Sequence, residues 1–176
     1  MSDFNFGMIS SLSDSSILEK GFFLWVWHAD KIPPHIGCSI NGHYYSLKVN
    51  GKDEGLLTSK VVSVIENKKI PSVFIELKKD FNSSEIQTVF ANYQLAESTK
   101  NTCLTPITEL FQCSDSIFQL SELLKNLKER GEIEAVFGLN LTEDYRNLPN
   151  YTQDDITSRL LKLENVKSEK HTSSIG

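Results

Sequence analysis

The dipeptide Asn41-Gly42 narrows the possible folds of this chain more than any other feature. Both residues tolerate positive φ, which a two-residue turn between antiparallel strands requires at its central positions. The flanking segments, residues 35–40 and 43–49, are mostly apolar, as paired strands are. The sequence therefore predicts a β-hairpin that spans residues 35–49.

A continuous aromatic and β-branched run, Phe22 to Trp27, precedes this hairpin. Such a run is typical of a strand that is buried on both faces, so we expect it at the centre of the sheet. Its aromatic side chains are accordingly assigned to packing and not to a ligand pocket. The consecutive Pro33 and Pro34 exclude a helix and predict a fixed loop that leads into the hairpin.

Beyond the hairpin, the spacing of apolar residues predicts four helices and two further strands. Residues 50–53 are expected to form a turn, and Pro71 and Gly131 are expected to end the first and last of these helices. Together the segments predict an α+β fold in which an antiparallel sheet of about four or five strands packs against helices. The expected helices are 58–67, 83–93, 103–111 and 116–130, and the expected strands are 73–77 and 135–137.

A chain of 176 residues suits one compact domain. Residues 1–20 are interpreted as a peripheral N-terminal segment that contains a short helix over 15–20. Residues 21–140 are interpreted as the α+β core, and residues 141–176 as a C-terminal extension. Residues 168–176 are polar enough that we expect disorder there.

Composition and charge disfavour several classes of function. A net charge of −5 and a pI near 5.4 disfavour a protein that binds nucleic acid through its phosphates, and the sequence has no Gly-rich phosphate-binding motif. The N-terminus is not basic and no long uncharged apolar run follows it, so we expect a cytoplasmic protein without a membrane span. The expected partner is a peptide or small amide or ester substrate, or another protein.

Two residues far apart in the sequence suggest cysteine catalysis. His35 opens the hairpin, and Cys103 lies where a polar loop gives way to an expected helix that tolerates Pro106 only in its first turn. A thiol becomes a useful nucleophile when an imidazole can take its proton and a helix N-terminus can stabilise the thiolate. The other thiols, Cys38 in a strand and Cys113 at the far end of its helix, are assigned structural roles. Three cysteines without a Cys-x-x-Cys spacing indicate neither a disulfide framework nor a zinc site.

Three motifs follow one another in the chain: His35-Ile36-Gly37, then Asn41-Gly42 with Tyr44-Tyr45, then Cys103 at a helix start. In this order they resemble the circularly permuted papain-like superfamily, the NlpC-like group that includes relatives of lecithin–retinol acyltransferase. The resemblance covers about residues 22–112, and the histidine precedes the cysteine as in permuted members. It implies a permuted papain-like fold and acyl transfer through a thioester, with Cys103 as the nucleophile and His35 as the general base. The Cys103 amide would help to hold the oxyanion, and no cofactor would be needed.

The group that orients the catalytic histidine is less clearly marked. Permuted relatives often have a polar group or second imidazole on the returning strand, where this sequence places Lys48 opposite residue 35. Lys48 cannot accept a proton, and Ser46, one diagonal step away on the same face, is a partial substitute. Glu76, on the expected strand 73–77, is the alternative because its carboxylate could accept a hydrogen bond from the imidazole.

Two other interpretations are compatible with these residues. The chain could be a non-enzymatic protein-binding or regulatory module built on a similar α+β scaffold, which the unclear orienting residue favours. His28 and Asp30 could join His35 in a metal site, since imidazole and carboxylate suit zinc or iron. Their spacing matches no metal-binding motif, so no metal ligand is assigned.

Overall fold

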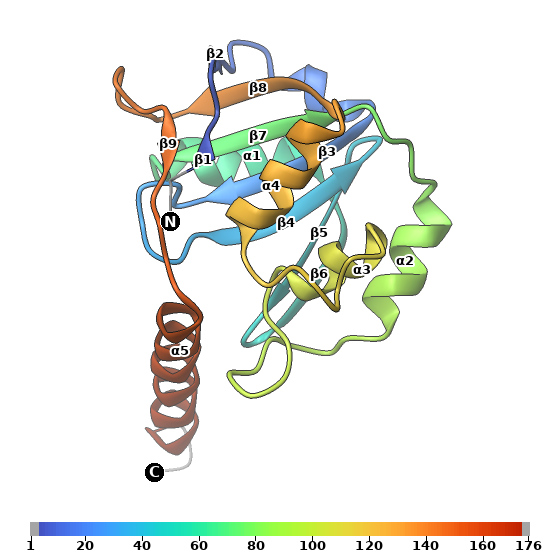
Figure 1. Ribbon diagram of the computed structural model, residues 1–176. Coiled ribbons are helices and arrows are strands. Elements are labelled where there is room, and N and C mark those ends of the chain that lie inside the picture. Colours follow the sequence, from blue (N-terminus) through green and yellow to red (C-terminus); the bar gives the residue numbers. More distant parts are fainter. Residues whose placement is uncertain (1–3, 174–176) are drawn as a thin grey trace.

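The computed structural model describes residues 4–173, which form an α+β fold (Figure 1). The class and the mostly antiparallel pairing confirm the prediction. Seven strands form the main sheet in the order β2-β8-β7-β3-β4-β5-β6, and β1 pairs with β9 separately. The strands are β1 (Phe4–Asn5), β2 (Ser10–Ser11), β3 (Phe22–Trp27), β4 (His35–Ile40), β5 (His43–Lys48), β6 (Gly51–Leu57), β7 (Ser72–Leu77), β8 (Ile133–Leu139) and β9 (Asn147–Leu148). The helices are η1 (Ser15–Glu19, a 3-10 helix), α1 (Thr58–Asn67), α2 (Ser83–Ala91), α3 (Thr105–Leu110), α4 (Leu120–Glu129) and α5 (Gln153–Ser173).

Strand β3 lies between β4 and β7, the central position that its apolar run predicts. Successive side chains of a strand point to opposite faces, so both faces of β3 must meet apolar partners. Leu24 and Trp25, one from each face, are both 0% exposed. The run Phe22 to Trp27 contains no charged residue because neither of its faces reaches water.

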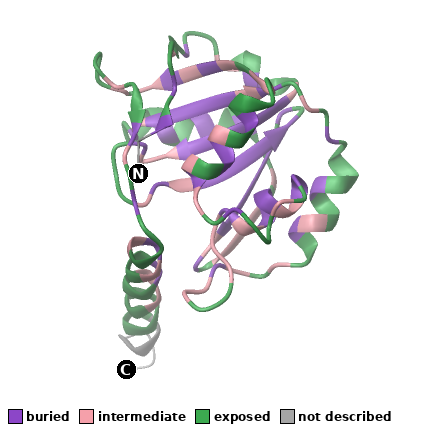
Figure 2. Cartoon of the chain, in the orientation of Figure 1, coloured by how far each residue is buried: buried purple, intermediate pink, exposed green. Residues whose placement is uncertain are grey.

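Helices cover both faces of the main sheet. The face that contains Leu24 packs against α2, α3, α4 and α5, and we call it the α3 face. The face that contains Trp25 packs against α1 and η1, and we call it the α1 face. Figure 2 shows the central strands buried between helices whose outer sides are exposed. The sheet therefore separates two apolar cores.

The main sheet has more strands than the four or five expected, and β6 is the largest addition. Of residues 50–53, which were predicted as a turn, Asn50 lies in the turn and residues 51–53 begin this strand, because β5 ends at Lys48 and β6 starts at Gly51. The first residues of β6 are polar and lie at the edge of the sheet, where apolar alternation is not required. Strands β1, β2 and β9 have two residues each, too few to show any period in the sequence.

The predicted helices are present with small shifts at their ends. Helix α1 has the expected bounds, and α2 begins after Asn82, whose side chain accepts a hydrogen bond from the Glu85 N–H. Helix α4 begins at Leu120 and not at residue 116, because Gln119 and Glu122 form the reciprocal capping contacts that start it. The hairpin, with β4 and β5 on either side of Asn41-Gly42, is confirmed.

The C-terminal segment differs from the prediction of disorder over residues 168–176. Residues 168–173 belong to α5, and residues 174–176 lie outside the described part of the chain. The helix is held at its start by Ile156 and Leu160, which are buried in the core of the α3 face. Strands β1 and β2 pair with β9 and β8, so segments from both ends of the chain lie side by side (Figure 1). Across residues 4–173, the search for a helix of the length and apolarity that a bilayer crossing demands finds none.

Candidate functional site

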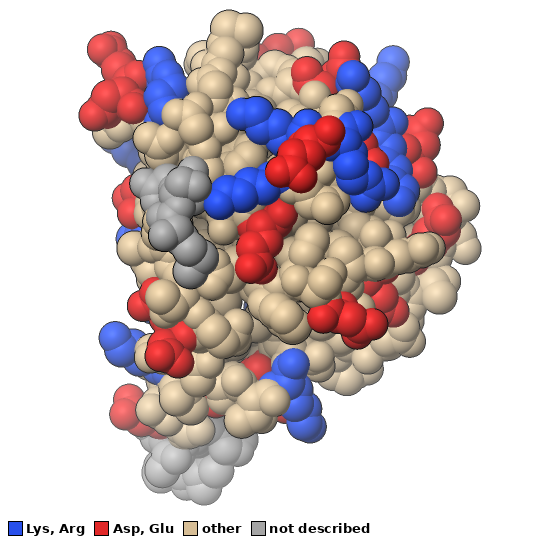
Figure 3. All heavy atoms as spheres, in the orientation of Figure 1, with Lys and Arg blue, Asp and Glu red and all other residues tan. Residues whose placement is uncertain are grey.

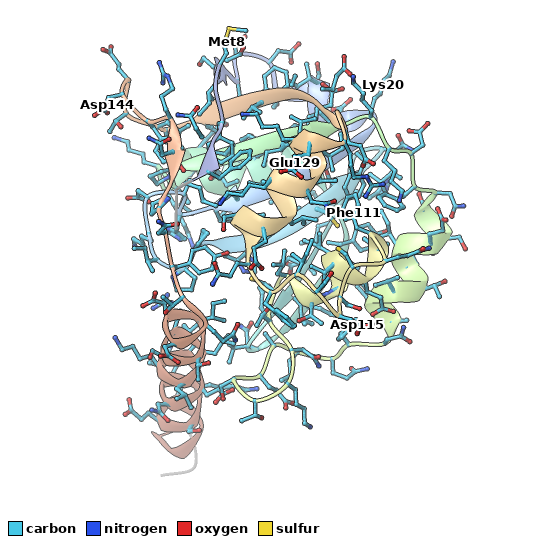
Figure 4. All side chains as sticks on the ribbon, in the orientation of Figure 1. Met8, Lys20, Phe111, Asp115, Glu129 and Asp144 are labelled. Carbon is cyan, nitrogen blue, oxygen red and sulfur yellow. The ribbon has the colours of Figure 1, made fainter. Side chains whose placement is uncertain are left out.

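Cys103 lies two residues before α3, in a turn that side chains hold in place. The Thr102 N–H donates to Thr105 Oγ1 at 2.9 Å, and the Leu104 N–H donates to Thr102 Oγ1 at 3.2 Å. Pro106 occupies the first turn of α3, as predicted. The other end of α3 is anchored by Phe111, whose ring contacts those of Phe22 and Phe81 (Figure 4).

The Cys103 thiol is half-buried and packs against the core of the α3 face. Burial raises its pKa to about 11. The backbone N–H groups of Ile36, Cys103 itself and Leu104 lower this pKa in part, since they favour the thiolate. The thiol thus lies near the start of β4 but on the α3 face, whereas the His35 ring lies beside Trp27 on the α1 face. The sheet therefore separates the sulfur from the imidazole, and the structure does not bring these two predicted catalytic side chains together.

The hairpin geometry explains how the Ile36 N–H can act on the thiol. In a two-residue hairpin the residues that flank the turn form a hydrogen-bonded pair, so the N–H groups of Ile40, Cys38 and Ile36 point toward β5. The paired register of β4 and β5 ends at Gly37 and Ser46. The thiol therefore lies at the seam between β4 and β5, where this pairing stops.

His35 is the first residue of β4 and lies opposite Trp27 of β3. The two rings are in edge contact on the α1 face, with centroids 6.3 Å apart. Burial lowers the pKa of His35 to about 4, and Lys48 acts in the same direction, while the Asp53 carboxylate raises it in part. The imidazole is consequently uncharged at neutral pH and able to accept a proton.

Ser46 and Asp53 form the polar support on the same face. Ser46 is fully buried, lies opposite Gly37 and donates through Oγ to Asp53 Oδ2 at 2.9 Å. The other Asp53 oxygen, Oδ1, accepts from Lys48 Nζ at 2.7 Å. Asp53 is thus the carboxylate that acts on His35. It was not predicted because residues 50–53 were assigned to a turn. A turn at Val49-Asn50 would have placed Asp53 opposite Ser46 and so identified it.

Glu76 is not brought to this site. It pairs with Phe23, whereas the residue of β7 that faces Trp27, the cross-strand partner of His35, is Ser72. Four residues along a strand correspond to roughly 13 Å. The assignment of Glu76 as the orienting residue was wrong because it rested on the presence of a neighbouring strand, without the register that decides which residues meet.

The other candidate residues lie apart from this arrangement. Cys38 is fully buried, and burial raises the pKa of its thiol. Cys113 is half-buried, and its Sγ donates to the Thr108 carbonyl at 3.4 Å. Among residues 4–173, no three His, Cys, Asp or Glu side chains gather in a way that could hold a metal ion, His28 and Asp30 included.

The lowered pKa of His35 predicts that acid destabilises the fold. Between the ordinary value of 6.5 and about 4, the unfolded chain binds a proton that the folded chain excludes. The free energy of unfolding should therefore fall as pH decreases through this window, by up to about 1.4 kcal/mol per pH unit from this one group. Urea unfolding at several pH values measures the slope. His35→Gln should flatten it, leaving the smaller contribution of His28, whose pKa is also lowered by burial; an unchanged slope would contradict the assignment.

Comparison with protein-family models, with curated proteins and with solved structures found no match in any of the three. The functional conclusion therefore depends on the geometry of the site.

Proposed function

We propose that this protein is a non-enzymatic protein-binding or regulatory module built on an α+β scaffold. The observation that supports the proposal most directly is the separation of the two predicted catalytic groups, because Cys103 packs on the α3 face of the sheet and the His35 ring lies on the α1 face. Nucleophilic cysteine catalysis requires a thiol and a base within reach of each other.

The alternative is a thiol hydrolase or acyltransferase of the circularly permuted papain-like type, acting on an amide or ester bond. In that reaction His35 would take the thiol proton while Cys103 Sγ forms a bond to the substrate carbonyl carbon, and the amine or alcohol would leave with this proton. Water or a second acceptor would then attack the thioester, and the proton it gives up would return to the thiol. This reaction requires the sulfur and the imidazole on one face of the sheet, and they lie on opposite faces.

Asp53, and not Glu76, is the carboxylate that acts on His35 on the α1 face, and both residues lie apart from Cys103. The Asp53 carboxylate raises the pKa of His35 in part because it favours the charged imidazolium. Ser46 and Lys48 hold the two carboxylate oxygens, each through one hydrogen bond. Ser46, the residue predicted to orient His35, thus acts on the carboxylate and only through it on the imidazole.

A cavity of about 590 Å³ adjoins the end of β5, and neither Cys103 nor His35 lines it. The Ala96 N–H at its edge donates to the Lys48 carbonyl at 2.8 Å, which connects the cavity wall to β5. Another part of the wall is α5, with Glu164 and Lys167. A cavity lined by both apolar and charged groups fits a peptide segment of a partner better than a purely aliphatic ligand.

The charges on the surface favour a peptide or protein partner over nucleic acid. Figure 3 shows Lys and Arg side chains next to Asp and Glu side chains on the face that it draws. Arg130 is paired with Glu132 at 2.8 Å, and Lys78 lies 3.7 Å from Glu134. Basic groups that already have acidic neighbours are poorly suited to bind a phosphate backbone.

Acylation by p-nitrophenyl acetate separates the two functions. The proposed module should give no burst of p-nitrophenolate and no acetyl group on Cys103 at neutral pH, because the buried thiol stays protonated. A thiol hydrolase would release p-nitrophenolate in a burst and keep one acetyl group as a thioester, which peptide mass spectrometry would locate on Cys103. Acetylation of Cys103 in the wild type that Cys103→Ala abolishes and the control Cys113→Ala retains would contradict the proposal.

The protonation state of Cys103 also favours the module. Burial raises the pKa of Cys103 to about 11, so the thiol is protonated at neutral pH. Its alkylation should therefore become fast only at the alkaline pH that this pKa implies. A folded wild-type protein whose Cys103 alkylates at neutral pH as fast as a free thiol would contradict this function.

A further inference from the structure

Strand β6 is the last strand at one end of the main sheet, and within the described residues it pairs only with β5. The opposite end of the sheet is closed in part by the two-residue strand β2, which pairs with β8 in parallel. β6 is longer, with seven residues. An open edge of this length presents a row of backbone donors and acceptors with which another strand can pair.

The register of β5 and β6 identifies the backbone groups that face outward. The residues that flank the turn, Lys48 and Gly51, form a hydrogen-bonded pair, and such pairs recur at every second residue. The N–H and C=O groups of Asp53 therefore point toward β5, and those of Lys52 and Glu54 point away from it. Among residues 4–173, these outward groups have no hydrogen bond to another backbone group.

The segment Gly51–Gly55 is self-complementary when two copies run antiparallel. Its residues are Gly, Lys, Asp, Glu and Gly in this order. With a two-fold axis beside Asp53, Lys52 of each copy lies opposite Glu54 of the other. The backbone groups of both residues point outward, so the register that pairs opposite charges also forms hydrogen bonds. The axis repeats the contact, as in any isologous interface.

The side chains of Lys52 and Glu54 lie on the same face of the sheet. They are two residues apart, and Lys52 pairs with Leu47, which belongs to the core of the α3 face. Within one chain Lys52 Nζ lies 3.0 Å from Glu54 Oε1. Two antiparallel copies would bring four charges of alternating sign together on this face. Opposite charges directly across two strands stabilise the pairing, and like charges destabilise it.

The glycines at the two ends of the segment leave space for a second backbone. A Cβ at Gly51 would meet no atom within 4 Å, and one at Gly55 would meet only the Tyr45 hydroxyl at 3.6 Å. Both glycines have positive φ, which by itself favours glycine, so the open space is the evidence that supports a second strand. Glycine within a strand is typical of positions where another backbone approaches closely.

The same axis places Asp53 opposite its own copy on the α1 face, which is unfavourable. Each carboxylate, however, accepts hydrogen bonds from Lys48 Nζ at 2.7 Å and from Ser46 Oγ at 2.9 Å. Lys48 thus supplies a counter-charge within each copy and reduces the repulsion. An axis beside Lys52 or Glu54 would place two equal charges opposite each other and form no Lys–Glu pair across the strands.

We propose that β6 pairs with β6 of a second copy of this chain, antiparallel and with the two-fold axis beside Asp53. The two main sheets then form one continuous sheet across the axis. Contacts of this size are at the low end of protein–protein interfaces, so the dimer is weak and its population depends on protein concentration. The pairing is independent of the proposed function, because it uses neither the cavity beside α5 nor Cys103.

Sedimentation equilibrium over a range of protein concentrations tests the pairing. The wild-type mass should rise from that of one chain, 19.9 kDa, toward twice this value. Glu54→Lys, which places lysines opposite each other, should weaken the dimer by at least about tenfold, because attraction at two symmetric positions becomes repulsion. Lys52→Glu together with Glu54→Lys should restore the dimer. Glu134→Lys, a reversal of the same sign at an exposed position of β8, is the matched control.

Amide hydrogen exchange locates the interface residue by residue. The N–H groups of Lys52 and Glu54 should exchange rapidly in dilute protein and more slowly as the dimer forms, because exchange then requires dissociation. The Asp53 N–H, which already lies in the ladder with β5, serves as the internal reference. Glu54→Pro removes an outward donor and no donor of that ladder, so it should abolish the dimer while the circular dichroism spectrum stays that of the wild type.

Each result decides the proposal. A wild type that remains monomeric overturns it, in favour of a strand from a different protein at this edge. A dimer that persists in both Glu54→Lys and Glu54→Pro forms through another surface and also overturns it. A folded double charge reversal that stays monomeric overturns the register. None of these results depends on the acylation of Cys103, so this proposal and the proposed function fail separately.

Discussion

His35→Ala is expected to leave the alkylation of Cys103 by iodoacetamide at the wild-type rate, because the imidazole and the thiol lie on opposite faces of the sheet. A histidine that acted as general base would contribute about 10²–10⁴-fold, so its removal would slow the reaction by at least about 10²-fold. The thiolate is the reactive form of cysteine, and burial holds the pKa of this thiol near 11, so the wild-type reaction is slow at neutral pH. The rate is followed by mass spectrometry of the Cys103 peptide over a range of pH.

His43→Ala is the matched control for this measurement. His43 belongs to the same hairpin but is exposed, and its Nδ1 contacts only the Asn41 carbonyl. The control should therefore alkylate at the wild-type rate, and so should His35→Ala. In both variants the pH dependence should follow the thiol alone. A rate that falls by about 10²-fold in His35→Ala and not in His43→Ala would show that His35 acts on Cys103, and would contradict the proposed function.

Trp25→Ala is expected to destabilise the fold by about 3–5 kcal/mol, the usual cost of removing a large aromatic side chain from a core. Trp25 is 0% exposed, and its ring packs between those of Tyr44 and Phe74 at centroid distances of 4.8 Å. The substitution also leaves the buried Ser39 hydroxyl without its donor. A loss of this size is a large fraction of the 5–15 kcal/mol that stabilises an ordinary domain.

Urea unfolding monitored by circular dichroism measures this loss. Trp25→Phe keeps most of the ring contacts and should cost less than half as much, while Ser39→Ala removes the partner hydroxyl and isolates the single hydrogen bond, worth about 1 kcal/mol. A Trp25→Ala protein as stable as the wild type would mean that the core of the α1 face is not packed as described.

The elements that the sequence predicts correctly are those with a strong local signal. The central strand β3 follows from a six-residue apolar run, and the hairpin follows from Asn41-Gly42. Helix α1 follows from apolar residues that recur on one side and from the proline after it. In each case the information lies within a few neighbouring residues, which is the range over which propensity and periodicity act.

The candidate site could be predicted only in part. His35 and Cys103 were identified because their residue types and local settings suit a thiol and its base. Asp53 was missed, and Glu76 was assigned in its place, because the register between strands decides which carboxylate lies near His35. A shift of the second turn by two residues moves Asp53 from a loop to the position opposite Ser46, and no local signal in this polar edge strand reports that shift.

The sequence by itself determined the α+β class, the central strand, the hairpin and the chemistry available at residues 35 and 103, since these depend on side-chain type and on short-range spacing. Tertiary structure alone decided that β6 extends the sheet, that Asp53 supports Ser46, and that Cys103 and His35 lie on opposite faces of the sheet. These features join residues far apart along the chain. Their partners are selected by register and by packing of the whole molecule, and not by the residues beside them.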